Sequence, residues 1–387
     1  MRNILLILYV VLSLVAAGQD AKQGVAKEEI LRTNPYLQNP TNAGITVSWQ
    51  TNVPCYSWVE YGLDTAHMQR AHTLIAGQVI SNNKLNKIRI NDLEKGKKYY
   101  YRVHSREIIE FKPYKKVFGE EYVSPFYSFS LPTDGKEEFT ALVFNDLHQK
   151  RELMDALIKV VREGGVEYDF VVFNGDCIDD PSTEAQAIES ISYFNDRVGA
   201  SSKPVIYIRG NHEIRGAFSM DFTTLFDYAG GKSYGAFSWG DTRIVMLDCG
   251  EDKPDDHWVY YGLNDFNNFR REQVEFLNAE HASAAFKKAA KRILIHHIPL
   301  WNSPQAAENE TDKYQPCTEM WGDLIAAEPY NLILNAHTHR FASFKKGAIP
   351  VVIGGGNTMN SASVMVLTNK SLECYNTNGE QILNLEI

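Results

Sequence analysis

Five short apolar runs, each followed directly by polar residues, constrain the fold of this 387-residue chain most strongly. Their length is typical of strands buried on both faces of a sheet. The runs lie at residues 139–144, 170–173, 205–208, 292–295 and 332–334. Helices are expected among them, at residues 152–162, 184–198, 271–287 and 319–328. Strands that alternate with helices predict an α/β layered domain, which we expect to end in several short strands within 342–386.

The preceding segment has a different pattern, because its apolar residues alternate with polar ones. Short runs of this kind, separated by Asn, Gly, Pro and Asp, predict an all-β sandwich over residues 31–133. The runs lie at 44–50, 57–61, 87–91, 99–104 and 126–130. We expect Trp49 in the core of this domain, and residues 131–135 as the connection to the next one.

Residues 1–17 have the pattern of a signal peptide, with 18–30 as a linker. Arg2 precedes an apolar run at 4–15, and Val15, Ala16 and Ala17 offer small residues before Gly18. The run is short for a membrane span, which needs about 20 residues. We therefore expect an exported protein, periplasmic or secreted, that has no membrane attachment once the peptide is cleaved.

Charge and cysteine content exclude some classes of protein. Lys and Arg number 39 against 48 Asp and Glu, a net charge of −9. This balance argues against a nucleic-acid polymer as partner, but a small anionic substrate can still meet a locally positive site. The five cysteines are isolated and form no CxxC pair, so neither a zinc ribbon nor a disulfide framework is expected.

Each of the five apolar runs is followed by polar residues of the types that bind metal ions. They are Asp146 and His148; Asn174 and Asp176; Asn211, His212 and Glu213; His296 and His297; and His337 and His339. Sites in open α/β sheets form at the carboxyl ends of strands, so these groups should converge. A nitrogen and oxygen donor set without thiolates favours Mn, Fe, Zn or Co. Asp176 is suited to bridge two ions that lie about 3.5–4 Å apart.

In this order the motifs resemble those of the calcineurin-like metallophosphoesterase superfamily. They read Asp146-Leu-His148, Gly175-Asp176, Gly210-Asn-His-Glu213, His297 and Ala336-His-Thr-His339, where Ala336 replaces a glycine of the pattern. The stretch His297-Ile-Pro-Leu-Trp-Asn-Ser303 is similar to that of purple acid phosphatases and selects His297 over His296 as a ligand. The resemblance implies a fibronectin-III-like domain at 31–133 and a calcineurin-like domain of layered α/β architecture at 137–387.

The resemblance also implies roles for individual residues. One metal ion would be held by Asp146, His148 and His339, a second by Asn211, His297 and His337, and Asp176 would bridge them. Metal-bound hydroxide would attack phosphorus, while His212 would stabilise the transition state or protonate the leaving oxygen. Either Glu213 or Asp179 could orient His212.

Position 179 departs from the purple acid phosphatases. They place a tyrosine that binds Fe(III) three residues after the bridging aspartate, where this chain has Asp179. We therefore expect no ferric tyrosinate site and no obligate ferric ion.

Together these features predict an exported binuclear phosphoesterase that resembles acid phosphatases and hydrolyses small phosphate monoesters or diesters. One alternative is a phosphodiesterase or nucleotide-type hydrolase of the same fold. A degenerate, non-catalytic binding protein is another, although the complete ligand set argues against it.

Two further features near the motifs allow more than one interpretation. Arg215 could clamp a phosphate group or be an ordinary surface arginine. An aromatic loop, with His257, Trp258, Tyr260 and Tyr261, could form a wall of the substrate site or simply pack against the domain.

Overall fold

The computed structural model describes residues 24–133, 135, 138–304, 306 and 315–387. The predicted signal peptide, residues 1–17, lies outside the described residues, as do residues 18–23 of the linker. Within the described part of the chain, no helix is both long and apolar enough to span a bilayer.

The N-terminal part of the chain is an all-β domain, as its alternating pattern predicts. Seven of its strands form one antiparallel sheet in the order β1-β2-β7-β8, with β3 and β6 on β2 and β9 on β7. Strands β1, β2, β6, β7 and β9 contribute side chains to one apolar core, in which Trp49 is fully buried. The strands are β1 (Tyr36–Thr41), β2 (Gly44–Gly62), β3 (Gln69–Ala71), β4 (Leu74–Ile75), β5 (Gln78–Val79), β6 (Ser81–Ile90), β7 (Lys98–Lys112), β8 (Lys115–Val123) and β9 (Tyr127–Ser130).

The prediction of two separate strands at 44–50 and 57–61 was wrong, because β2 runs through both. The Asn52-Val-Pro54 segment reads as a turn in sequence, since proline lacks the backbone donor of a regular ladder. In the structure its pairing with β6 is irregular between Gln50 and Cys55. The irregularity accommodates Pro54 and lets β2 pair first with β1 and β6 and then with β7 and β3.

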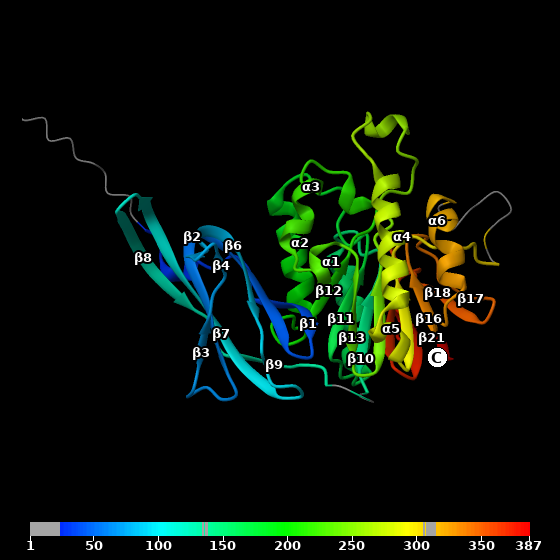
Figure 1. Ribbon diagram of the computed structural model, residues 1–387, viewed down its shortest axis with the longest axis horizontal. Helices are drawn as coiled ribbons and strands as arrows, with labels where there is room; N and C mark the ends of the chain where they lie inside the picture. The colour runs from blue at the N-terminus through cyan, green and yellow to red at the C-terminus, as the bar shows by residue number, and fades with distance from the viewer. Residues whose placement is uncertain (1–23, 134, 136–137, 305, 307–314) are drawn as a thin grey trace, which may run out of the picture.

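The rest of the chain forms two six-stranded sheets that pack face to face (Figure 1). One has the order β12-β11-β10-β19-β20-β21 and the other β13-β14-β15-β16-β18-β17. In the first sheet β12, β11 and β10 are parallel and β19 is antiparallel to β10, and in the second β14, β15, β16 and β18 are parallel. Their strands are β10 (Thr140–Phe144), β11 (Phe170–Asn174), β12 (Val205–Ile208), β13 (Gly235–Trp239), β14 (Thr242–Met246), β15 (Lys291–Ile295), β16 (Leu332–Asn335), β17 (Ala342–Lys346), β18 (Ile349–Ile353), β19 (Ser363–Thr368), β20 (Ser371–Asn376) and β21 (Gln381–Glu386).

Helices cover the outer face of each sheet, which explains the unbroken apolar runs. In β10, Ala141 and Val143 face the other sheet, whereas Leu142 and Phe144 pack with helices α1 (Arg151–Glu163) and α2 (Glu184–Arg197). Helices α4 (Phe266–Ala282) and α6 (Gln315–Ala326) cover the second sheet. The predicted α/β layered domain is confirmed.

One predicted helix is divided. The segment expected as a single helix at 271–287 contains the end of α4 and the start of α5 (Ala284–Lys288). Ser283 separates them in an extended conformation, and its hydroxyl accepts a hydrogen bond from the Phe286 backbone N–H at 3.0 Å. Serine is a favoured N-cap, so it starts a new helix here.

The two parts of the chain are joined by buried and half-buried hydrogen bonds. Tyr36 donates its hydroxyl to the Leu225 carbonyl at 3.0 Å, and Thr46 donates to Asp227 at 2.5 Å. The Tyr101 hydroxyl donates to the Ser201 carbonyl at 2.7 Å. The all-β domain is therefore anchored to the loops around residues 201 and 225–227.

Candidate metal centre

The predicted ligands all lie just beyond the carboxyl ends of parallel strands, and the fold brings them together. Asp146 and His148 follow β10, Asp176 follows β11 and Asn211 follows β12. His297 follows β15, and His337 and His339 follow β16, so the second sheet supplies three histidines. Among the described residues three groups of side chains have ligand atoms within 4.8 Å of one another, and one of them joins His148 to Asp179 and His212. The other two consist of predicted ligands: Asp146, His148, Asp176 and His339; and Asp176, His297 and His337. Asp176 belongs to both.

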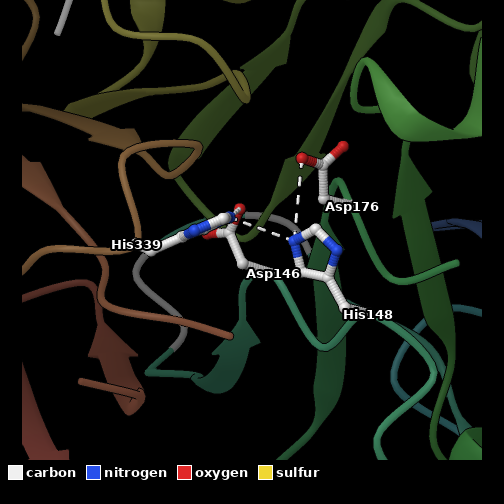
Figure 2. A group of neighbouring side chains, drawn as sticks. All are labelled: Asp146, His148, Asp176 and His339. Atoms are coloured by element: carbon white, nitrogen blue, oxygen red, sulfur yellow. Dashed lines mark hydrogen bonds and ion pairs between the residues drawn. The ribbon is translucent and has the colours of Figure 1, made fainter. Parts of the chain in front are cut away.

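The first group points its side chains toward one place (Figure 2). The Nε2 atoms of His148 and His339 are 3.0 Å apart, and His339 Nε2 lies 3.5 Å from Asp146 Oδ1. Two nitrogens that each lie about 2.1 Å from one ion, at right angles, have about this separation. The spacing therefore fits a cation shared by the two imidazoles.

The second group contains a buried nitrogen that a cation would satisfy. His297 Nε2 lies 3.1 Å from Asp176 Oδ2, yet it has no hydrogen bond of acceptable geometry to any described residue. Both side chains are buried. His337 Nδ1 meets Asn211 Oδ1 at 2.9 Å, which adds the predicted amide to this group. The donor set, without a thiolate, therefore fits two metal ions on either side of Asp176.

The backbone is strained at these positions. Left-handed φ angles occur at Asp146 (48°), His148 (46°), Asp176 (49°), His337 (71°) and His339 (56°). Such a conformation costs about 1–3 kcal/mol for a residue other than glycine and is concentrated at functional sites. Five of the seven predicted ligands share it, so the loops are shaped to aim these side chains rather than to minimise local strain.

Two glycines allow the backbone to approach the ligands. A Cβ atom on Gly175 would lie 2.3 Å from His297 Nδ1, and one on Gly356 would lie 2.2 Å from the Cβ of Asp146. Any larger residue at either position would displace a predicted ligand.

Neighbouring polar groups fix how the imidazoles are oriented. His297 donates from Nδ1 to the Asn174 carbonyl at 2.8 Å, which leaves Nε2 facing the cluster. Asn357 pairs with His339 Nδ1 at 3.2 Å, and Asp179 contacts His148 Nδ1. Partners of this kind set the tautomer and direction of a ligating histidine.

Sequence reasoning missed Asn357, although a signal was present. It follows the buried strand β18 and three glycines, 354–356, at the same edge of the sheet as the predicted ligands. Its backbone N–H donates to the Asp146 carbonyl at 2.8 Å. A polar residue behind a sixth apolar run was therefore a further sign of the site.

Glu213 and Asp179 have different roles. The buried Glu213 carboxylate accepts backbone hydrogen bonds from Asp176, Cys177, Ile178 and Gly210, at 2.7–3.1 Å, and so joins two of the loops. His212 Nδ1 instead lies 3.3 Å from Asp179 and 3.4 Å from Asp180. Asp179 is thus placed to orient His212, together with Asp180, which sequence reasoning did not single out.

Burial and ion pairing set the charges of the cluster. Burial raises the pKa of Asp146 to about 7. Burial also acts on Asp176 and His297, but their attraction outweighs it, so the pKa of Asp176 lies well below its ordinary value and that of His297 rises to about 10. Burial lowers the pKa of His337 to about 3 and that of His339 to about 4. These two imidazoles are therefore neutral at pH 7, the form that binds metal.

His212 stands at the edge of the cluster, with its side chain 26% exposed. Its ring lies edge-on to His148, with centroids 4.8 Å apart, and Nε2 faces Arg215 Nη1 at 3.3 Å. Arg215 forms a bidentate ion pair with Glu251, with nitrogen–oxygen distances of 2.9 and 2.7 Å. Its guanidinium is thus committed to Glu251 rather than held open for phosphate.

Comparisons with known proteins agree with this architecture. The family model for calcineurin-like phosphoesterases matches residues 139–341, more than half of the chain. The chain therefore belongs to the calcineurin-like phosphoesterase family, as its motifs indicate.

Within that family the chain is similar to purple acid phosphatases. It is 22% identical to purple acid phosphatase 22 of Arabidopsis thaliana over 293 residues, which cover 71% of this chain and 59% of that protein. The fold matches a purple acid phosphatase from yellow lupin (Lupinus luteus) seeds with a TM-score of 0.68 and 14% identity, over 91% of this chain and 73% of that one. PhoD matches with a TM-score of 0.64 and 11% identity, over 92% and 89%.

Proposed function

We propose that this protein is a binuclear metal-dependent phosphoric ester hydrolase that resembles acid phosphatases and acts on small phosphorylated substrates. The observation that carries the proposal is the pair of ligand groups that share Asp176. A carboxylate between two donor sets is what two neighbouring dications require, and such a pair binds and activates the phosphoryl group.

In this proposal Asp146, His148 and His339 hold one ion, and Asn211, His297 and His337 hold the other. The ions, drawn from Mn, Fe, Zn or Co, would neutralise phosphate charge and lower the pKa of water. Asn174 and Asn357 orient the histidines through the hydrogen bonds described above. Glu213 fixes the loop that carries Asp176 against the loop that carries Asn211.

His212 is the proposed catalytic residue that is not a ligand. Its partly exposed ring lies beside His148, so it can reach a phosphate ester bound at the ions. Asp179 and Asp180 lie 3.3 and 3.4 Å from Nδ1, so these carboxylates can orient the ring. An imidazole in this position can stabilise the transition state or protonate the leaving oxygen.

We also propose that the protein is exported and that the all-β domain is a fibronectin-III-like platform. The apolar segment at residues 1–17 supports export. The hydrogen bonds from Tyr36, Thr46 and Tyr101 to the catalytic domain support a fixed platform.

The proposal is tested with p-nitrophenyl phosphate and bis(p-nitrophenyl) phosphate side by side. The purified chain, loaded in turn with Mn, Fe, Co or Zn, is expected to hydrolyse at least one of the two esters between pH 5 and 9. The ratio of the two rates assigns monoester or diester preference. Absence of turnover for both esters with all four metals would overturn the proposal.

A further inference from the structure

A cavity lies beside the candidate metal centre and has no part in the roles assigned above. It has a volume of about 540 Å³ and is lined by residues 214–220 and by the segment between β14 and α4. That segment projects beyond the helices at the top of Figure 1. Arg215 lines the cavity and also approaches His212, so the cavity opens next to the proposed catalytic residue.

Much of the wall of this cavity is apolar. Met220, Tyr261 and Leu263 line it and are 88%, 82% and 86% exposed, and Val259 adds a further apolar surface. Large apolar side chains grouped around a hollow mark a binding site, whereas single exposed ones do not. The grouping therefore points to an apolar ligand.

The two charged side chains that line the cavity, Arg215 and Lys253, are already paired with carboxylates of the projecting segment. Arg215 forms a bidentate ion pair with Glu251, and its Nη2 lies 3.0 Å from Asp252 Oδ1. Lys253 Nζ lies 2.5 Å from the same oxygen. Two cations thus meet two carboxylates. The net charge of this network is zero, so it offers little attraction to a second phosphate group on the ligand.

The projecting segment is held firmly at its base. Arg270 is fully buried and donates to the carbonyls of Cys249 at 2.9 Å and Glu251 at 2.8 Å. The Asp255 carboxylate accepts the backbone N–H groups of Phe266 and Asn267 at 3.0 and 2.9 Å. These bonds tie residues 249–255, the first part of the segment, to α4, so the apolar wall extends from a fixed base.

We propose that this cavity binds the organic group of the phosphate ester and selects an uncharged apolar or aromatic group over one that carries further phosphate. The inference rests on the proposed function, because it places the phosphoryl group at the metal centre beside His212. It assigns the aromatic loop to the substrate site rather than to packing alone.

The test compares esters whose leaving alcohols have similar acidity. For the metal-loaded chain, kcat/KM is expected to be about tenfold higher for 2-phenylethyl phosphate than for ethyl phosphate. Tenfold corresponds to about 1.4 kcal/mol, or about 55 Å² of apolar surface removed from water. Ethane-1,2-diyl bisphosphate is expected to be the poorest of the three substrates.

The double variant Met220→Ser/Leu263→Ser should remove most of that preference by raising KM for the phenylethyl ester, with little change for ethyl phosphate. Both side chains are exposed, so the fold should tolerate the change. Ile75→Ser, at a residue 63% exposed in the all-β domain, is the matched control. Equal kcat/KM for the three esters, or an unchanged preference in the double variant, would overturn the inference.

A binding measurement separates this inference from the proposed function. Titration calorimetry compares phenylethylphosphonate with ethylphosphonate, neither of which can be hydrolysed as an ester. Tighter binding of the phenylethyl compound, lost in the double variant, supports the cavity even if no ester is hydrolysed. Hydrolysis of all three esters without such a binding preference refutes the cavity and leaves the proposed function standing.

Discussion

The buried ligand cluster and the exposed rim beside it are built differently, although they are in contact. Asp146, Asp176 and His297 are at most 1% exposed, and their loops have strained or glycine-dependent backbones. On the rim, the side chains of His212 and Asp179 are 26% and 42% exposed. The cluster is fixed by its backbone and by buried hydrogen bonds, whereas the rim is held by side-chain ion pairs.

In the proposed function, this difference assigns metal binding to the buried cluster and substrate handling to the exposed rim. A buried carboxylate without a countercharge is costly, so the cluster should respond to mutation through loss of metal. Truncating an exposed side chain of the rim does not leave a buried charge unpaired. Its variants should therefore keep their metal and lose rate or specificity.

The largest effect is expected from Asp176→Asn, which removes the carboxylate common to both ligand groups. Metal ions contribute several kcal/mol to the transition state, and each 1.36 kcal/mol is tenfold in rate. Activity should fall at least about a thousandfold. The number of metal ions bound per chain, measured by inductively coupled plasma mass spectrometry, should also fall. Asp323→Asn, at an exposed position on α6, should change neither quantity; full metal content in Asp176→Asn would remove the distinction between cluster and rim.

His212→Ala tests the rim. General acid–base groups contribute about 10²–10⁴-fold, so kcat should fall by that factor while both ions are retained. The matched control is His67→Ala, whose side chain is 87% exposed on the all-β domain. Normal turnover in His212→Ala would exclude this residue from the mechanism. Loss of metal in this variant would show that His212 helps to bind the metal ions.

Asn357→Ala should produce a smaller effect on the cluster side. Removing the partner of a ligating histidine costs about 10–100-fold in metal affinity. We expect a weaker dissociation constant for one of the two ions and nearly normal kcat at saturating metal. Competition with a chromophoric chelator measures the affinity, and the exposed Asn378→Ala is the control. Unchanged affinity for both ions would show that His339 does not need this partner.

The last prediction concerns the visible spectrum, in which we expect no tyrosinate absorption band. The rim has Asp179 where purple acid phosphatases place an iron-binding tyrosine, so the chain loaded with ferric ion should lack a tyrosinate absorption band. Visible spectroscopy of the loaded protein checks this directly. A purple solution would contradict the assignment of Asp179.

The clustering of the predicted ligands could be foreseen from the sequence because each follows a buried strand within a few residues. Strand C-termini meet at one edge of a sheet, so five local motifs were enough to place Asp146, Asp176 and His339 together. The layered architecture followed from the same apolar runs.

The rest depends on contacts between segments far apart in the chain. The pairing of Arg215 with Glu251 joins separate loops and leaves no local signature. Asn357 could be noticed as a polar residue that follows an apolar run, but its partner His339 could not, because the two residues lie on different loops. The course of β2 through Pro54 was hidden for a similar reason, because tertiary pairing with β6 and β7 overrides the local turn signal. The apolar wall of the cavity likewise becomes recognisable only when residues 214–220 and 253–264 are seen together.

The number and position of bound metal ions test the central claim most directly. Anomalous scattering from crystals of the metal-loaded chain should show two ions about 3.5–4 Å apart, one on each side of Asp176. The ion on one side should contact Asp146, His148 and His339, and the other Asn211, His297 and His337. A fully loaded crystal with a single ion, or with ions bound away from Asp176, would contradict the account.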